Sequence, residues 1–293
     1  MINHLTVGPV RFLLNGEDGI PVRYDDWAYG GFFADREVKG ARRPLAELPV
    51  QLVRGAGQMP ATPPWFSAGR NWAVWQDGGD WLFCTGFSGR ERPRVTCRLY
   101  GGGGLDRATL NVDGDPADAP LRYPLDQVLS WGLLGRCGGV LLHAATVVCD
   151  GAGLVFAGRS GAGKTTLSSL CHQAGWRVLN DDRVMLFRRD GRLFVAGTPW
   201  HGSGRFAEAD EVPLAGIFLL SQAPFESLER LPPGDAWQSL LPVAGIPWFE
   251  PAWADASLDA LHDFSRSVPV NRFHFRPLPS SVSALESWRK EQA

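Results

Sequence analysis

The pattern of apolar and polar positions changes near residue 120 and divides the chain of 293 residues into two parts. Before this point, short aromatic and β-branched runs alternate with glycine-rich turn sequences, which is typical of β-strands. The sequence Asp77-Gly78-Gly79-Asp80 lies between two of the runs and predicts a hairpin turn. The clearest runs are residues 71–76, 81–85, 94–100 and 107–112. We therefore predict a β-rich amino-terminal region over residues 1–120.

Beyond residue 120 the apolar positions predict helices and strands in alternation. Apolar residues spaced by three and four positions predict a helix over residues 123–135. The runs 141–149 and 154–157 are almost entirely apolar, as expected of strands that are covered on both faces. Further strands are predicted at residues 177–180, 184–188, 192–196, 214–220 and 268–276, and further helices at 164–174 and 280–290. The pattern predicts an α/β domain over residues 121–293.

The overall charge of the chain is nearly balanced. There are 29 basic and 31 acidic residues, and hydrophobic residues make up 44% of the chain. These values are ordinary for a globular protein and give no reason to expect nucleic acid or a membrane surface as a partner. The five cysteines have no CxxC spacing, so neither a disulfide framework nor a zinc site is predicted. Because we find no secretion signal and no apolar run long enough to span a bilayer, we expect a cytoplasmic protein.

One segment carries a complete phosphate-binding motif. Residues 158–165 read Gly-Arg-Ser-Gly-Ala-Gly-Lys-Thr and match G-x-x-x-x-G-K-[ST], with a predicted strand before them and a predicted helix after them. The glycines let backbone N–H groups turn toward phosphate oxygens, and the helix N-terminus adds the positive end of its dipole. Lys164 brings a positive charge to the β- and γ-phosphates, and the Thr165 hydroxyl is a ligand for Mg²⁺. We therefore predict ATP and Mg²⁺ as cofactors, with the nucleotide held by Gly158, Ser160, Gly161, Ala162, Gly163, Lys164, Thr165 and Thr166.

Two adjacent carboxylates follow the next predicted strand. Asp181 and Asp182 come directly after residues 177–180. In an open α/β sheet the carboxyl ends of the strands face the ligand crevice, so these side chains are expected beside the P-loop. Phosphoryl transfer needs carboxylates there, one to hold Mg²⁺ and one to accept the proton of the attacking hydroxyl. The sequence Asn-Asp-Asp is also good turn sequence, but the P-loop favours the functional interpretation.

A histidine in an apolar strand completes a larger resemblance. His143 alone would be read as a hydrogen-bonded core residue. However, Leu142-His143-Ala144, residues 156–165 and residues 180–184 (Asn-Asp-Asp-Arg-Val) together resemble the catalytic core of the HPr kinase/phosphorylase family, which phosphorylates a serine of a small carrier protein. The resemblance implies a P-loop kinase core with a mixed sheet. It also implies that Asp181 is the general base, that Asp182 is the second acid near the metal, and that His143 interacts with the catalytic aspartate.

The sequence departs from that family after the acidic pair. The family has a metal-binding Glu there, for which Glu208 is the nearest candidate by spacing, and the phosphorolysis signature is not recognisable. Residues 1–120 do not resemble the usual partner domain of the family, and we expect them to serve in substrate recognition. The chain is more similar to the smaller kinase-like members found with peptide-modification clusters, which carry a Thr-Pro-Trp-x-Gly-like stretch, as residues 198–202 do here. The nucleotide core of ATP-dependent phosphoenolpyruvate carboxykinases is similar as well, although those enzymes are much longer.

These features predict a kinase that transfers the γ-phosphoryl group of ATP to a serine or similar hydroxyl of a peptide or small protein. In this prediction the catalytic residues are Asp181, His143, Lys164 and Asp182, and the metal ligands are Thr165, Asp182 and Glu208. Two other classes stay open: a carboxykinase-like enzyme or ATPase with the same loop, and a non-catalytic nucleotide sensor. The sequence names neither the acceptor nor the oligomeric state, and it is compatible with a homo-oligomer.

Two aromatic segments each allow two interpretations. The glycine-rich stretch 199–205 either closes over the γ-phosphate or the acceptor, or is an ordinary surface loop. The stretch 242–255 forms either a groove for a peptide or the cap of a hydrophobic core, and the second is the commoner use of such residues. The larger side chains are Trp200, His201 and Arg205 in the first segment, and Trp248, Phe249 and Trp253 in the second.

Overall fold

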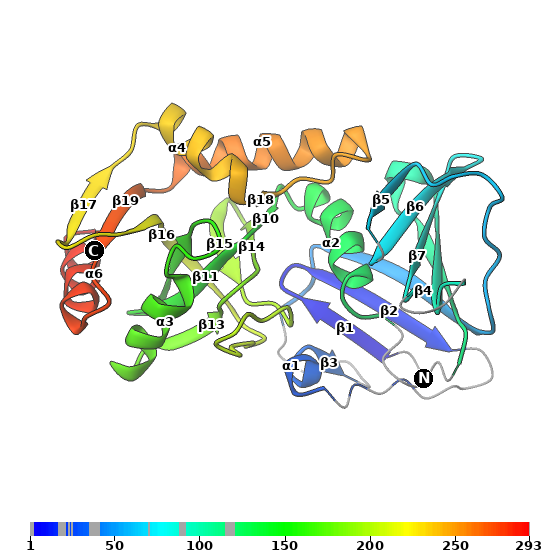
Figure 1. Ribbon diagram of the computed structural model, residues 1–293, viewed down its shortest axis with the longest axis horizontal. Coiled ribbons are helices and arrows are strands. Elements are labelled where there is room, and N and C mark those ends of the chain that lie inside the picture. The colour runs from blue at the N-terminus through cyan, green and yellow to red at the C-terminus, as the bar shows by residue number, and fades with distance from the viewer. Residues whose placement is uncertain are drawn as a thin grey trace. The chain divides into compact units, whose positions relative to one another are not determined.

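The chain folds into two compact units, seen in a computed structural model that describes residues 3–16, 22, 24, 26–34, 42–69, 71–87, 92–114 and 121–292 (Figure 1). Unit 1 comprises Met1–Arg136 and Pro247–Ala254, and unit 2 comprises Cys137–Ile246 and Asp255–Ala293. The boundary that we predicted near residue 120 falls outside the described residues. The structure instead places helix α2 (Leu125–Arg136) in unit 1, because this helix packs against strands β2 and β4 of that unit.

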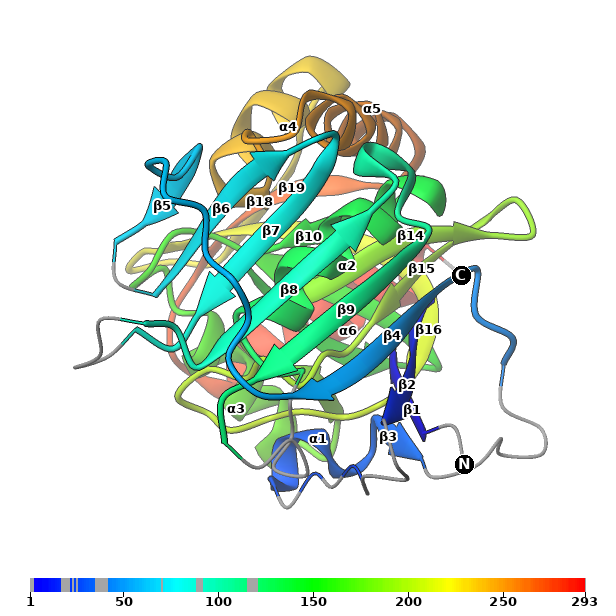
Figure 2. The same cartoon turned by 90° about the vertical axis from the view of Figure 1, so that its right-hand side faces the viewer.

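Unit 1 is built on one mixed sheet. Among the described residues it has nine strands in the order β3-β1-β2-β4-β9-β8-β7-β6-β5, and β4 is parallel to both β2 and β9 (Figure 2). The predicted hairpin is confirmed, because Asp77 pairs with Asp80 across the turn at Gly78 and Gly79. The strands are β1 (Asn3–Val7), β2 (Val10–Gly16), β3 (Phe33–Ala34), β4 (Ala46–Arg54), β5 (Phe66–Ala68), β6 (Trp72–Asp77), β7 (Asp80–Thr85), β8 (Val95–Tyr100) and β9 (Arg107–Val112), and short helices are α1 (Trp27–Gly30) and η2 (Gly102–Gly104).

An aromatic cluster fills the core of unit 1 around Phe249. Six aromatic rings lie with their centroids 5.7 to 6.5 Å from that of Phe249, and they belong to Phe66, Trp72, Trp81, Phe83, Trp131 and Trp253. Phe249 and Trp253 are buried, whereas Trp248 is 66% exposed. The core-cap interpretation of this segment is therefore confirmed for Phe249 and Trp253.

Unit 2 is built on a sheet that divides at the long strand β16 (Glu211–Gln222). One part has the order β13-β11-β12-β16-β19-β17 and the other the order β16-β15-β14-β10-β18. The sheet is mixed, because β12 and β19 run parallel to β16 and β15 runs antiparallel to it. The strands are β10 (Val140–Leu142), β11 (Ala144–Cys149), β12 (Ala152–Ala157), β13 (Arg177–Asn180), β14 (Val184–Arg189), β15 (Arg192–Ala196), β17 (Ser227–Arg230), β18 (Ala244–Gly245) and β19 (Val270–Phe275).

The predicted strand over residues 141–149 is two strands that meet at His143. Strand β10 pairs with β14 and β18, while β11 pairs with β12 and β13. At the break, the N–H of His143 donates to the carbonyl of Val243 at 2.7 Å and the N–H of Ala144 donates to the carbonyl of Asp182 at 3.1 Å. The chain thus passes from one part of the sheet to the other at His143, the polar residue within a run that was predicted as a single strand.

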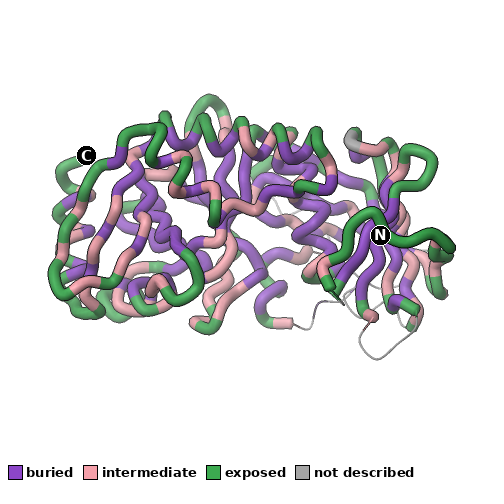
Figure 3. Tube along the Cα trace, turned by 45° about the horizontal axis from the view of Figure 1, so that its top comes forward, coloured by how far each residue is buried: buried purple, intermediate pink, exposed green. Residues whose placement is uncertain are grey.

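Helix α3 (Lys164–Gln173) covers the part of the sheet that carries the phosphate-binding motif. It packs against β11 and β13 and against helix α6 (Pro279–Glu291), with Leu167 and Cys171 in the shared hydrophobic core. The strands beneath are buried over most of their length (Figure 3). The remaining helices are α4 (Pro233–Leu240), η3 (Leu241–Val243) and α5 (Pro251–Ser267).

Helix α5 was not predicted from the sequence. The stretch 242–255 was interpreted only as a groove or a core cap, and Pro251 within it lies at the first position of the helix, where a missing N–H costs nothing. Among the described residues, no helix combines the length and the apolar character that crossing a membrane requires.

Candidate functional site

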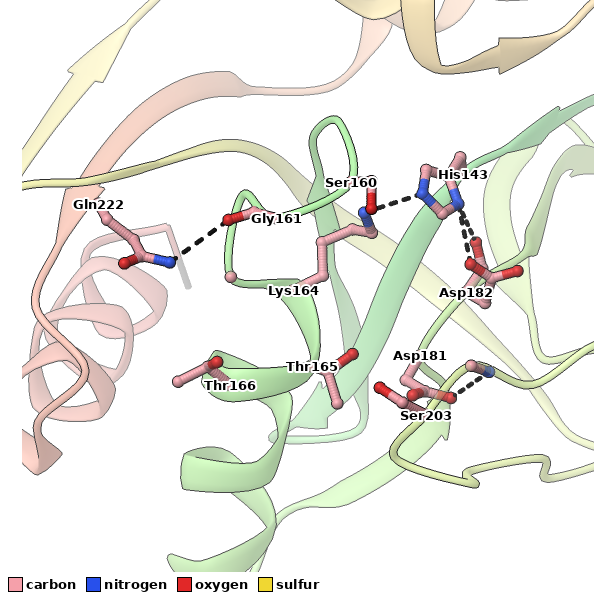
Figure 4. A pocket seen from close by; sticks show the side chains of 12 residues that line it. His143, Ser160, Gly161, Lys164, Thr165, Thr166, Asp181, Asp182, Ser203 and Gln222 are labelled. Carbon is pink, nitrogen blue, oxygen red and sulfur yellow. Dashed lines mark hydrogen bonds and ion pairs between the residues drawn. The ribbon is translucent and has the colours of Figure 1, made fainter.

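A pocket of about 320 Å³ opens in unit 2 where β12 ends and α3 begins (Figure 4). Its volume is at the lower end of the range for small-molecule sites. The lining residues are His143, Ser160, Gly161, Gly163, Lys164, Thr165, Thr166, Asp181, Asp182, Gly202, Ser203 and Gln222. The structure therefore brings together most of the site residues predicted from the sequence. The exceptions are Gly158, Ala162 and Glu208.

The glycines of the motif shape the loop between β12 and α3. Gly161 and Gly163 have φ angles of +83° and +100°, in the region that favours glycine. A Cβ on Gly163 would come within 2.6 Å of the Phe275 ring, so the position also has no room for a side chain. Gly158 and Ala162 do not line the pocket but pack on one another, since a Cβ on Gly158 would lie 2.7 Å from that of Ala162. These two residues therefore support the loop rather than face the pocket.

The side chain of Lys164 points into the pocket from the first turn of α3 (Figure 4). Its Nζ donates to the carbonyl of Gly158 at 2.8 Å and lies 3.0 Å from Nε2 of His143. Burial lowers the pKa of Lys164, and the nearby charge of Asp182 acts in the opposite direction. The pocket thus holds an ammonium group at the N-terminal end of a helix, where an anion is doubly favoured.

His143 is paired with Asp182. Its Nδ1 lies 3.0 Å from Oδ1 of Asp182 and 2.9 Å from the carbonyl oxygen of the same residue. A ring with its hydrogen on Nδ1 donates to Asp182 and leaves Nε2 free to accept from Lys164. Arg183 contacts the same ring, and its Nη1 lies 3.1 Å from Oδ2 of Asp182. Burial acts to raise the pKa of Asp182, but the hydrogen bond from His143 and the charge of Arg183 outweigh it and hold that pKa below its usual range.

Asp181 has a different environment. Its side chain is buried, and its carboxylate accepts backbone N–H groups from Gly202 at 2.8 Å, Gly204 at 2.6 Å and Phe206 at 3.4 Å. Figure 4 shows Asp181 turned toward the loop of Ser203, whereas Asp182 is turned toward His143. Three backbone N–H groups thus hold this carboxylate in place. The general-base role of Asp181 stays a prediction, and Asp182 is the carboxylate that contacts His143 and is half-buried at the pocket.

Glu208 lies outside the pocket, which corrects its assignment as a metal ligand. Its carboxylate accepts from Nε of Arg177 at 3.1 Å and also pairs with the terminal nitrogen of that side chain. Arg177 begins β13, and the pocket lies at the other end of that strand, beyond Asn180. The backbone N–H of Glu208 donates to the carbonyl of Leu179 at 2.9 Å, but the side chain turns away from the pocket toward Arg177.

The pocket offers oxygen donors that suit Mg²⁺. The described residues contain no group of three or more His, Cys, Asp and Glu side chains arranged to hold a metal ion by themselves. Mg²⁺ bound with a nucleotide needs no such group, since phosphate oxygens and water fill most of its coordination positions. The Thr165 hydroxyl and the carboxylate of Asp182 line the pocket and fit that use, whereas the Asp181 carboxylate is bonded to backbone N–H groups of Gly202 and Gly204.

Asn180 organises the acidic pair, although the sequence analysis gave it no role. The side chain is fully buried, and its Oδ1 accepts the N–H groups of Asp182 at 2.7 Å and Arg183 at 2.8 Å. Its Nδ2 donates to the carbonyl of Thr198 at 2.8 Å. The sequence could have indicated this role, because an Asn that precedes two turn residues commonly forms hydrogen bonds to their backbone.

For other residues that line the pocket, the sequence gave little or no indication of a place in the site. Gln222 lies at the end of β16, and its Nε2 is 3.4 Å from the carbonyl of Gly161. In the stretch 199–205 the small residues Gly202 and Ser203 line the pocket, whereas the larger side chains we had singled out (Trp200, His201 and Arg205) do not. The stretch 199–205 therefore lies beside the pocket, as the interpretation of a loop next to the γ-phosphate or the acceptor requires. It lines the pocket with Gly202 and Ser203 and not with its large side chains.

Comparisons with known proteins give a partial match. Residues 131–250 match a family model described as SynChlorMet cassette protein ScmC. No curated protein matches the chain. Among solved structures, one described as the Hpr(Ser) kinase/phosphatase from Coxiella burnetii is similar at 16% identity and a TM-score of 0.31, over 52% of this chain and 97% of that chain.

Proposed function

We propose that the protein is an ATP-dependent phosphotransferase that passes the γ-phosphoryl group to a hydroxyl of a peptide or small protein. One observation carries the proposal. Ser160, Gly161, Gly163, Lys164 and Thr165 of the P-loop motif share a single pocket with a His–Asp pair, and this supports a phosphate site beside a carboxylate able to accept a proton.

The phosphates of the nucleotide would lie against the loop of residues 158–165 and the N-terminus of α3. The glycines leave backbone N–H groups uncovered there, and Lys164 supplies a positive charge. The Thr165 hydroxyl would hold Mg²⁺ together with phosphate oxygens, and the ion would neutralise charge on the phosphates. Gln222 closes this end of the pocket by its contact with Gly161.

Asp182 is the general base in this proposal. Its pKa is held below the usual range, so the carboxylate is ionised near neutral pH, and the role of base rests on its position beside His143 in the pocket rather than on high basicity. His143 orients it from a fixed position, since the backbone of His143 is bonded to Val243 at the junction of two strands. The metal role that the sequence analysis gave to Asp182 is thereby replaced by the role of base.

The acceptor class rests on the resemblance to small kinase-like proteins of peptide-modification clusters. The name of the matched family model, a cassette protein, states no reaction and no acceptor. Unit 1 presents Trp65 and Trp248, each 66% exposed, and the proposal gives this unit the role of substrate recognition. Exposed aromatic side chains suit the binding of peptide side chains.

The proposal is tested with γ-labelled ATP, Mg²⁺ and a panel of peptides with accessible serines, while release of ADP is followed in parallel. We expect label on a peptide, and a loss of about a hundredfold or more in Asp182→Asn, with nucleotide binding retained. Asp263→Asn is the control, because Asp263 pairs with Arg188 and does not line the pocket. ADP release without labelled peptide would favour an ATPase, and tight ATP binding without turnover would favour a nucleotide sensor.

A further inference from the structure

The stretch from Gly202 to Phe206 is bonded to one side chain of the pocket. Three of its backbone N–H groups point to the carboxylate of Asp181, at 2.8, 2.6 and 3.4 Å from Gly202, Gly204 and Phe206. The three donors belong to alternate residues and surround one carboxylate, and Asp181, which carries it, is only 2% exposed.

The glycines of this stretch are required by the close approach. A Cβ on Gly202 would lie 2.8 Å from Oδ2 of Asp181, and a Cβ on Gly204 would lie 2.7 Å from the same atom. The next residue, Arg205, has a φ angle of +57°, which is uncommon for a residue with a side chain. The backbone is therefore shaped to the carboxylate, and the contact is not an incidental one.

The turn that contains Asp181 is fixed by hydrogen bonds of the neighbouring residues. Asn180 donates to the carbonyl of Thr198 and accepts the N–H groups of Asp182 and Arg183, and Thr198 Oγ1 donates to the carbonyl of Arg183 at 2.7 Å. The turn of the acidic pair and the start of the glycine-rich stretch thus form one hydrogen-bonded unit. Asp181 lies in this turn, and its own carboxylate makes the direct bonds to Gly202, Gly204 and Phe206.

We propose that Asp181 is a positioning residue that holds Gly202–Phe206 against the pocket, so that Ser203 forms the wall on the acceptor side. Gly202 and Ser203 are the residues of this stretch that line the pocket, and Ser203 is the one with a side chain. It lines the pocket together with Thr165 and Asp182. The proposal divides the acidic pair into two roles: Asp182 accepts the proton and Asp181 builds the wall. Its consequence for the acceptor rests on the proposed function, whereas the hold on the loop does not.

The test compares wild type with Asp181→Asn in the absence of ligand. An amide keeps the shape of the side chain but replaces one acceptor oxygen by an NH₂ group, which cannot accept from a backbone N–H. We expect hydrogen exchange at Gly202, Gly204 and Phe206 to accelerate by about tenfold or more, while α3 and the central strands exchange as in wild type. Asp210→Asn is the matched control, because the carboxylate of Asp210 also accepts a backbone N–H, from Glu211 at 2.8 Å, but does not line the pocket.

A second variant keeps the aspartate and disturbs its contact. Gly202→Ala should accelerate exchange over the same stretch, because the new Cβ forces the loop away from Oδ2. The binding of ATP with Mg²⁺, measured by calorimetry, should stay within about threefold of wild type in both variants, because phosphates contact the loop of residues 158–165. Unchanged exchange in both variants would overturn the proposal. General unfolding of both variants would also overturn it, because the contacts of Asp181 would then stabilise the whole of unit 2 and not only this stretch.

The result of the hydrogen-exchange experiment can be interpreted whether or not the proposed phosphoryl transfer is found. Exchange is read without nucleotide or acceptor, so it reports on the hold of Asp181 even if the protein transfers no phosphoryl group. If transfer is found, the same variants should raise the KM for the peptide more than they lower nucleotide binding, which a merely structural role of Asp181 would not do.

Discussion

The imidazole of His143 lies 3.0 Å from the carboxylate of Asp182, in a contact that joins the break between β10 and β11 to the turn after β13. The other nitrogen of the ring is 3.0 Å from Nζ of Lys164. One side chain therefore links the proposed base to the lysine that follows the loop between β12 and α3, and both contacts depend on where the strand is broken.

Replacement of His143 should weaken transfer more than nucleotide binding. In His143→Ala the Asp182 carboxylate loses its hydrogen-bond donor and its orientation, so we expect kcat to fall by about tenfold or more. Binding of ATP should change by less than about threefold, since Lys164 keeps its contact with the Gly158 carbonyl. Equal losses in kcat and in affinity would contradict the role given to the ring.

The acid limb of the pH profile of kcat/KM should follow the protonation of Asp182. The pKa of this group is lowered from 3.8, so the base stays ionised as the pH falls and loses activity only below that ordinary value. Removing the hydrogen bond in His143→Ala takes away a cause of the lowering, and the acid limb should move to higher pH. An acid limb at the same pH in wild type and variant would show that another group controls it.

Asn180 should contribute strongly to the stability of unit 2. Asn180→Ala leaves the buried N–H groups of Asp182 and Arg183 and the carbonyl of Thr198 without this partner, which should cost about 2–4 kcal/mol in free energy of unfolding. Denaturant unfolding followed in unit 2 measures the cost. Asn15→Ala removes an exposed Asn–Gln contact and should change stability by about 0.5 kcal/mol or less.

The aromatic cluster of unit 1 should be sensitive to Phe249 and insensitive to its neighbour. Phe249→Ala removes a buried ring that touches several others, and we expect a loss of about 3–5 kcal/mol. Trp248→Ala changes a side chain that is 66% exposed, so thermal unfolding of unit 1 should be nearly unaffected. Similar losses in the two variants would contradict the assignment of Phe249 to the core.

The sequence predicted those features that local rules determine. The hairpin at Gly78 and Gly79 follows from turn chemistry, and the loop of residues 158–165 between a strand and a helix follows from a motif with a fixed context. The bond that Asp182 makes with His143 depends on a break within an apolar run, which the hydrophobic pattern does not record. The environment of Asp181 depends on a loop that joins it only through tertiary hydrogen bonds. Glu208 was chosen by spacing alone, and spacing does not tell which way its side chain turns, which is toward Arg177.

The most direct test is a calorimetric titration of the purified protein with ATP in the presence of Mg²⁺, repeated with Lys164→Ala. The account predicts saturable binding of one nucleotide per chain in wild type and a loss of affinity of about tenfold or more in the variant, because the charge that faces the phosphates is removed. Absence of binding in wild type, or the same affinity in both proteins, would contradict the central claim that this pocket holds the phosphates of a nucleotide.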